Sequence, residues 1–462
     1  MFNKETYIQR RQRLKKDIGT GIILLLGNED TGMNYKDNCY PFRQDSSFLY
    51  FIGLDKPSLA AVINIDEDKE IIFGNDPTID DIVWMGTQPS VSELAAPTGI
   101  TTVMPVKELK TVIQKAMAAG QAIHFLPPYR PENFIKLSEM VDIPVRAIKE
   151  KASVVLIKAV IAQRAIKTNE EVAEINKAVN SSNEMHLAAM RHTKEGMTEM
   201  QVAGIVQGIA IGAGGNISYP IIYTVDGQTL HNHPTTKLLR KGELVLCDAG
   251  AETAMHYAGD LTRTFPVSKK FSAIQKEVYD IVLGAEQAAA VALAPGKLFR
   301  DIHFLAAEHL VEGLKQMGLM KGDAKEAVQQ GAHALFFPCG LGHMMGLDVH
   351  DMEDLGEQYV GYTDELKKST VFGLKSLRLG RSLEPGFVLT VEPGIYFIPE
   401  LIDMWEGQKK FIDFINYDKL ATFRHFGGAR IEENFLITDK GYQLLGGPLI
   451  KTTEEVEAFM TE

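Results

Sequence analysis

The chain has 462 residues, enough for two to four domains of ordinary size. Its hydrophobic content of 45% and charged content of 23% are typical of a globular protein with a sizeable core. The net charge of −12 argues against nucleic acid or an anionic membrane as the main partner, because both bind clustered lysine and arginine.

Cysteine content and apolar runs predict where the protein works. Cys39, Cys247 and Cys339 are too few and too widely spaced for a disulfide framework, so a reducing, cytoplasmic location is expected. The apolar run at residues 22–26 is too short for a signal peptide. No run approaches the ~18 apolar residues of a membrane span, so none is expected.

The first third of the chain alternates short apolar runs with helical patterns. Runs bounded by Gly, Asn or Asp predict strands at residues 21–28, 48–54, 60–66 and 70–75. Further along, the pattern predicts a strand at 101–106, a helix at 107–120, a strand at 121–127 and a helix that begins at Pro131. This alternation indicates an α/β domain that ends between residues 150 and 168.

Longer amphipathic helices predominate from Thr168 onward. Three helix starts have the spacing of a capping box, namely Thr168 with Glu171, Thr198 with Gln201 and Ser272 with Gln275. Two long helices are expected at about 273–293 and 299–317. Strand-like segments follow each helix pair, so the order helix, helix, strands occurs twice and suggests a pseudo-duplicated domain.

Four carboxylates adjoin apolar strands: Asp248, Asp260, Glu392 and Glu432. One such residue would usually be a strand end or a turn, but four together would repel one another unless cations or protons neutralise them. Two divalent ions would match the four charges. Oxygen ligands with one imidazole suit Mn²⁺, and Zn²⁺, Co²⁺ or Fe²⁺ are compatible. Asp248 and Asp260 are expected on adjacent strands, where their side chains can converge.

The segment "FPCGLGHMMGLDVHD", residues 337–351, offers two histidines for such a site. Its glycines do not match the dinucleotide-binding fingerprint, and the chain has no HExxH motif. His343 and His350 would stand about 10 Å apart on a helix and would face opposite sides of a strand. We therefore expect the two histidines to have different roles.

Four segments in this order resemble the pita-bread metallopeptidases of the aminopeptidase P and prolidase group: "DAG…GDLTRTFPV", "GLGHMMGLDVHD", "LTVEPGIY" and "RIEENFLIT". Residues 40–53, "YPFRQDSSFLYFIG", resemble the N-terminal domain that accompanies aminopeptidase P. The resemblance implies an α+β protein. A pita-bread (creatinase/aminopeptidase-like) catalytic domain is expected at residues 166–462, preceded by a smaller α/β domain at residues 1–165.

The resemblance also implies roles for individual residues. The family's dinuclear metal ligands fall on Asp248, Asp260, His343, Glu392 and Glu432. Asp260 and Glu432 would bridge two divalent ions, with Mn²⁺ the expected metal, and a water or hydroxide between the ions would attack the scissile carbonyl. Glu392 would help to move the proton, and His350 and His231 would contact substrate. Thr262, Tyr396 and Arg430 match positions that hold the carboxylates.

Two more residues are expected at the substrate pocket. Trp84 resembles a tryptophan that the family's N-terminal domain contributes to a neighbouring subunit's pocket, although a tryptophan in an apolar run is commonly a core residue. Cys339 stands where the family usually has a histidine, four residues before His343. This departure is expected to affect rate or specificity rather than metal binding.

The activity that the resemblance implies is a metal-dependent Xaa-Pro aminopeptidase acting on short peptides with proline in second position. The alternative is an Xaa-Pro dipeptidase (prolidase), whose motifs are nearly the same. A metal-free creatinase and a non-enzymatic peptide-binding scaffold are disfavoured, because all five ligand positions are intact. A homodimer or homotetramer is expected from the family likeness.

Overall fold

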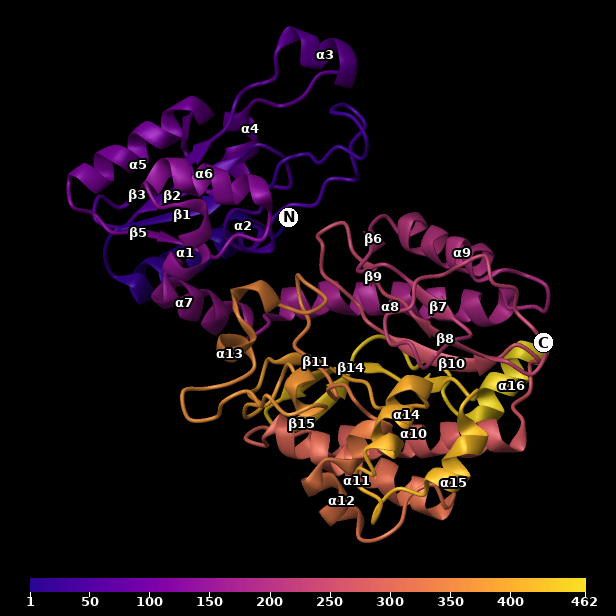
Figure 1. Ribbon diagram of the computed structural model, residues 1–462. Helices are drawn as coiled ribbons and strands as arrows, with labels where there is room; N and C mark the ends of the chain where they lie inside the picture. The colour runs from indigo at the N-terminus through magenta and orange to yellow at the C-terminus, as the bar shows by residue number, and fades with distance from the viewer. The chain divides into compact units, whose positions relative to one another are not determined.

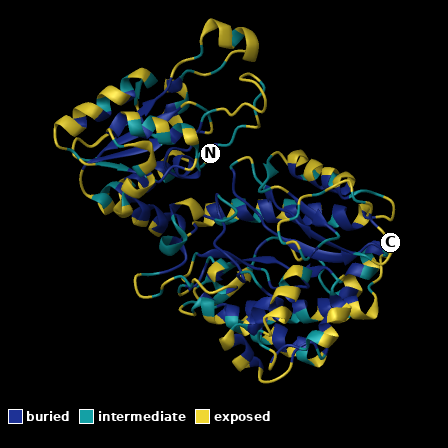
Figure 2. Cartoon of the chain, viewed as in Figure 1, coloured by how far each residue is buried: buried dark blue, intermediate teal, exposed yellow.

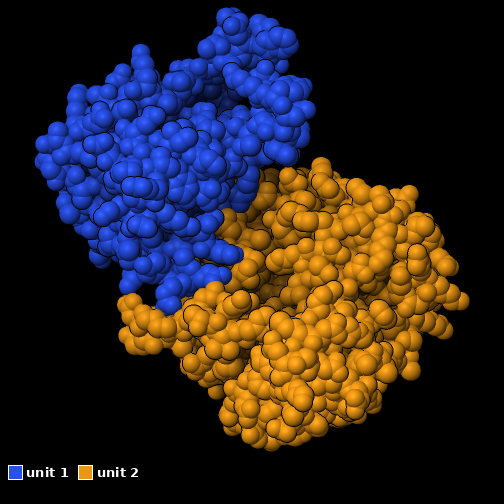
Figure 3. Space-filling model, viewed as in Figure 1, with its two compact units in different colours: residues 1–164, 352–359 blue, residues 165–351, 360–462 orange.

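The computed structural model describes all 462 residues and divides them into two compact units (Figures 1 and 3). Unit 1 comprises Met1–Arg164 and Met352–Tyr359, and unit 2 comprises Ala165–Asp351 and Val360–Glu462. Each unit encloses its own buried core (Figure 2). None of the helices combines the length and apolar character that a membrane crossing requires.

Unit 1 is built on a mixed five-stranded sheet in the order β4-β3-β2-β1-β5. Its strands are β1 Ile22–Leu26, β2 Ala60–Asn64, β3 Lys69–Phe73, β4 Thr102–Met104 and β5 Ile123–Phe125. Its helices are α1 Lys4–Ile18, α2 Ser46–Ile52, α3 Ile79–Met85, α4 Val91–Ala95, α5 Leu109–Ala118, α6 Pro131–Val141 and α7 Val154–Arg164. Buried residues of β1, β2 and β3 pack with Ile113 of α5 and Leu137 of α6 to form the core.

The strand predicted at residues 48–54 is wrong, because most of this segment forms helix α2. The Asp45 carboxylate caps the helix by accepting the Phe48 N–H at 2.8 Å, and Gly53 ends it in a left-handed conformation (φ 78°). All seven helical residues are buried, so the apolar run carries no periodicity that separates a buried helix from a buried strand.

Unit 2 contains two helix pairs, each followed by strands, in agreement with the predicted repeat. The first pair is α8 Asn169–His192 and α9 Glu199–Gly212, and the second is α10 Ala273–Ala292 and α11 Phe299–Gln316. The remaining helices of unit 2 are α12 Ala324–Gln330, α14 Pro399–Gly407, α15 Tyr417–Leu420 and α16 Thr453–Thr461, whereas α13 Glu357–Val360 falls mostly in the second segment of unit 1. The three predicted capping boxes are confirmed at the starts of α8, α9 and α10.

The two three-stranded sheets of unit 2 lie between the two helix pairs (Figure 1). The first half contributes β6 Asn216–Ile217, β7 Ile222–Thr224, β8 Leu244–Asp248, β9 Ala251–Glu252 and β10 Thr262–Pro266. The second contributes β11 Val388–Val391, β12 Gly394–Tyr396, β13 Gly428–Arg430, β14 Glu433–Thr438 and β15 Gly441–Leu444. The sheets β10-β8-β7 and β11-β14-β15 belong to different halves, and a bridge between Thr262 and Glu432 joins them. Residues 170 positions apart therefore meet at this junction.

Candidate active site

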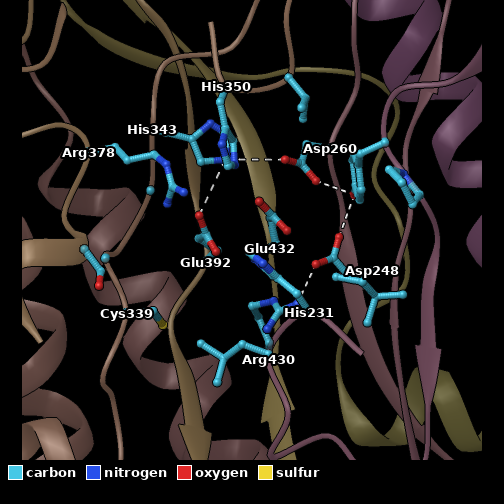
Figure 4. A pocket seen from close by; sticks show the side chains of 18 of the residues that line it. His231, Asp248, Asp260, Cys339, His343, His350, Arg378, Glu392, Arg430 and Glu432 are labelled. Carbon is cyan, nitrogen blue, oxygen red and sulfur yellow. Dashed lines mark hydrogen bonds and ion pairs between the residues drawn. The ribbon is translucent and has the colours of Figure 1, made fainter. Parts of the chain in front are cut away.

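Unit 2 encloses a cavity of about 400 Å³ at the junction of its two halves (Figure 4). Ten of its lining residues carry polar side chains that are labelled in Figure 4: His231, Asp248, Asp260, Cys339, His343, His350, Arg378, Glu392, Arg430 and Glu432. The four carboxylates and His343 point toward one another across the cavity (Figure 4).

The first half of unit 2 supplies two of the carboxylates. Asp248 ends β8 and pairs with Thr262 of β10, and Asp260 precedes the same strand by two residues. The Tyr219 hydroxyl lies 2.6 Å from Asp248 Oδ1 and also contacts Asp260 Oδ1. The Asp260 N–H donates to Asn434 Oδ1 at 3.1 Å, which joins this segment to β14. The Tyr219 hydroxyl thus connects the two carboxylates.

The second half supplies Glu392 and Glu432. Glu392 directly follows β11, and its N–H donates to Leu341 O at 2.7 Å. That backbone hydrogen bond fixes Glu392 beside the segment that carries His343. Glu432 lies between β13 and β14, where its N–H donates to Thr262 O at 3.1 Å. Its Oε2 accepts the Thr262 hydroxyl at 2.7 Å, so Thr262 holds Glu432 in the cavity wall.

His343 is the imidazole at the centre of the carboxylate cluster. Its Nε2 lies 3.4 Å from Asp260 Oδ2 and 3.6 Å from Glu392 Oε1. Its Nδ1 lies 3.0 Å from Met344 O, which assigns the ring proton to Nδ1 in the neutral form and leaves Nε2 as the ligating nitrogen. Ligand atoms of Asp260, His343 and Glu432 all lie within 4.8 Å of one another. This spacing is suitable for a metal ion.

The cluster holds more negative than positive charge. Arg430 is the guanidinium within it, donating to Tyr396 Oη at 2.8 Å and Thr262 Oγ1 at 3.1 Å and pairing with Asp248. Burial raises the pKa of Asp248 and of Glu432, and it raises the pKa of Glu392 to about 7. Oxygen donors with one imidazole fit divalent cations, which would relieve this excess of charge.

The two histidines of residues 337–351 lie closer together than expected. Their ring centroids are 4.2 Å apart, because the chain is neither helical nor fully extended between them. It reverses after Met345, where the Gly346 N–H donates to Asp348 O at 3.0 Å and the Asp351 N–H donates to Met344 O at 2.9 Å. The separation expected for a helix or a strand is therefore wrong, and both imidazoles reach the cavity.

The other predicted site residues have different positions. His231 lies at the exposed rim of the cavity, and Cys339 lines its wall. Burial raises the pKa of the Cys339 thiol to about 12. Trp84 does not line this cavity: it lies on α3 of unit 1, where 84% of it is exposed, so it is not a core residue.

Sequence reasoning missed three residues of the site. Tyr219 contacts two carboxylates, Arg378 lines the cavity, and Asn434 binds the Asp260 backbone. Only Asn434 had a detectable signal, since an asparagine within the apolar pattern of a strand requires a buried partner. Tyr219 and Arg378 lie outside regular elements, where no periodicity indicates direction.

Comparison with known families covers both units. Residues 173–439 match the model of metallopeptidase family M24, and residues 7–124 match the aminopeptidase P N-terminal domain.

Known relatives resemble the chain over nearly its whole length. It is 32% identical to a human Xaa-Pro dipeptidase, over 99% of this chain and 92% of that protein. It is 30% identical to a probable Xaa-Pro aminopeptidase of Uncinocarpus reesii, over 96% of this chain and 91% of that protein. Among solved structures, zinc-substituted Escherichia coli aminopeptidase P in complex with product superimposes with a TM-score of 0.81 at 27% identity, covering 100% of this chain and 98% of that one.

Proposed function

Because the chain belongs to metallopeptidase family M24, and so is a metal-dependent hydrolase, we propose that it acts as an Xaa-Pro aminopeptidase on short peptides. The names of its relatives support Xaa-Pro peptides as the substrate class. An Xaa-Pro bond is a tertiary amide without an N–H, and its rigid ring excludes it from many general peptidases. The proposed reaction releases the residue that precedes proline.

The convergence of Asp260, His343 and Glu432 within 4.8 Å is the observation that carries this proposal. The proposed ligands of two divalent ions are Asp248, Asp260, His343, Glu392 and Glu432. Bound divalent ions lower the pKa of water to give a nucleophile at neutral pH and polarise the scissile carbonyl. The oxygen-rich donor set favours Mn²⁺ as the proposed metal, with Zn²⁺, Co²⁺ and Fe²⁺ as competitors.

The protein's own residues would divide the remaining work. Glu392 would accept and return a proton, a role to which a carboxyl with a pKa raised to about 7 by burial is suited. His350 would contact the substrate near the scissile bond, and His231 would help to hold the proline side and the tetrahedral intermediate. Thr262, Tyr396 and Arg430 would hold the carboxylates through the hydrogen bonds described above.

Arg378 supports a second candidate, an Xaa-Pro dipeptidase. It lines the same cavity as His343 and Glu392. A guanidinium binds a carboxylate through two parallel hydrogen bonds. The free carboxylate of an Xaa-Pro dipeptide belongs to the proline itself, so a cation inside the cavity would favour dipeptides over longer chains.

Cleavage of Ala-Pro-Phe and of Ala-Pro after reconstitution with Mn²⁺ tests both candidates. We expect alanine to be released from Ala-Pro-Phe, and we expect no cleavage of the control Ala-Ala-Phe. Cleavage of Ala-Pro without cleavage of Ala-Pro-Phe would instead favour the dipeptidase. In that case Arg378→Met should raise KM for the dipeptide more than Arg378→Lys does. The same assay with Zn²⁺, Co²⁺ and Fe²⁺ after chelation identifies the metal.

We also propose a homodimer or homotetramer in which Trp84 reaches the substrate pocket of a neighbouring subunit. Helix α3 exposes Ile79, Val83, Trp84 and Met85, each by more than 70%, which favours burial against a partner. Light scattering measures the assembly, and Trp84→Ala should raise KM. The three free cysteines support the proposed cytoplasmic location.

A further inference from the structure

A buried ion pair lies beneath the turn that carries His350. Lys167 Nζ and Asp351 Oδ2 are 2.9 Å apart, and each side chain is only 1% exposed. Removal of one partner from such a pair is strongly destabilising, because it leaves an uncompensated charge away from water. The proposed reaction uses neither residue, so the pair needs another explanation.

Asp351 closes the turn in two ways. Its main-chain N–H donates to Met344 O at 2.9 Å, directly after His343. Oδ2 of its carboxylate accepts a hydrogen bond from Lys167 Nζ, and Oδ1 accepts one from the Asp348 N–H at 3.4 Å. Because Asp351 directly follows His350 in the chain, these bonds hold the backbone next to His350.

Lys167 is itself anchored at its backbone. Its N–H donates to Gly386 O at 2.9 Å, just before β11, and the next residue, Thr168, caps helix α8. A Cβ at Gly346 would meet Asp351 Oδ2 at 2.6 Å and Lys167 Cε at 3.0 Å. The glycine therefore leaves the space that the ion pair occupies, and the ammonium group has little freedom to move.

The turn also contacts the segments that carry the carboxylates. The Met345 N–H donates to Val388 O of β11 at 3.0 Å, and Glu392 directly follows that strand. Gly346 O accepts the Ala258 N–H at 2.8 Å, two residues before Asp260. A shift of this turn would move His350 relative to both halves of the site.

From these contacts we propose that Lys167 is a positioning residue, which acts through Asp351 to hold His350 against the proposed metal cluster. The inference rests on the proposed peptidase function. Lys167 touches no reacting atom; its buried ammonium group holds the Asp351 carboxylate in place, and that carboxylate holds the turn.

Hydrogen exchange of the metal-free protein tests the structural half of the inference without any assay of activity. Lys167→Met should raise the exchange rates of the amides of Met345, Gly346 and Asp351 by about tenfold or more relative to the wild type. The matched control is Lys451→Met, which removes a lysine 3.0 Å from the fully buried Glu286. The control should leave the exchange rates of the turn unchanged. Unchanged rates in Lys167→Met would overturn the inference.

Kinetics test whether Lys167 acts through His350. At saturating Mn²⁺, Lys167→Met should lower kcat/KM for the cleaved peptide by roughly 10–100-fold, the usual cost of a lost supporting contact. In a His350→Ala background the same change should cost less than about twofold, because residues that act as a unit are not additive. An equal loss in both backgrounds would overturn the inference and leave Lys167 with a merely structural role.

A double variant keeps the inference testable if Lys167→Met does not fold. Lys167→Met/Asp351→Asn removes both charges, so it should recover the thermal stability that Lys167→Met loses. If Lys167→Met does not fold, the exchange and kinetic measurements are made on this double variant, with the same expected results. A wild-type protein without activity on any Xaa-Pro peptide would contradict the proposed function alone, since the exchange result is read from metal-free protein.

Discussion

Two buried polar clusters share strand β10 and the start of β14 but face opposite sides. Glu432, which accepts the Thr262 hydroxyl, lines the cavity, where four carboxylates are accompanied by the guanidinium groups of Arg378 and Arg430. Their neighbours Arg263 and Glu433 form an ion pair on the other side, with side chains 0% and 4% exposed. Successive residues of a strand point to opposite faces, so one pair of strands builds both clusters.

Charge balance distinguishes the two clusters. Arg263 pairs with Glu433 and also donates to the main-chain oxygens of Thr262, Glu432, Leu449 and Ile450. Lys451 pairs with Glu286 nearby, which leaves this cluster neutral. In the cavity cluster, four carboxylates outnumber the two guanidinium groups of Arg378 and Arg430. Loss of one partner from the paired cluster would leave a buried charge uncompensated, whereas the excess negative charge of the cavity cluster suits a bound cation.

The largest expected effect is the loss of activity caused by a substitution in the cavity cluster. Asp260→Asn should lower kcat/KM by at least about 1,000-fold at saturating Mn²⁺, since even the supporting partners of metal ligands cost 10–100-fold. The melting temperature of the metal-free variant should not fall, because the change removes one repelling charge. Mn²⁺ content by elemental analysis checks the cause, and full metal content with unchanged activity would contradict it.

A substitution in the cluster of Arg263 and Glu433 should lower stability instead. Arg263→Met should lower the free energy of unfolding by about 3–5 kcal/mol, because it leaves Glu433 with only the 3.7 Å contact to Lys451. Denaturant unfolding measures the loss. Arg263→Met/Glu433→Leu should recover part of it, and a double variant as unstable as the single one would count against a charge-balance explanation.

Stability of the metal-free protein should fall as pH rises through neutrality. Burial raises the pKa of Glu392 from 4.5 to about 7, so the folded state binds this proton more tightly than the unfolded state. The resulting stabilisation, roughly 3 kcal/mol, is fully present below the unfolded pKa and is lost as pH rises through about 7. Thermal unfolding at pH 5 to 8 measures it. Glu392→Gln should flatten the profile, and an equally steep profile in that variant would assign the effect to other groups.

The smallest effect is expected at Cys339, which lines the cavity without a proposed charge role. Cys339→Ala should change kcat/KM by less than about tenfold and should leave Mn²⁺ affinity unchanged. Since burial raises the pKa of its thiol to about 12, iodoacetamide at pH 8 should modify Cys39 first. Mass spectrometry of the peptides checks the order, and rapid labelling of Cys339 would contradict it.

Local patterns predicted a large share of this molecule. Thr168, Thr198 and Ser272 mark helix starts, because a capping box involves residues only three apart. The acidic residues beside apolar strands indicated a cavity with excess negative charge, because a carboxylate next to a buried strand has few other solutions. Helix α2 was missed, because a segment buried on all sides shows no periodicity.

The sequence by itself predicted which residues would carry the proposed chemistry and in which order, since the types and spacing of motif residues are local properties. Only the tertiary structure decided how they meet. The turn at Gly346 brings His350 to His343, Tyr219 connects Asp248 with Asp260, and Lys167 reaches Asp351 across 184 positions. Such contacts depend on how two halves of the chain pack, and no pattern within a short window records that packing.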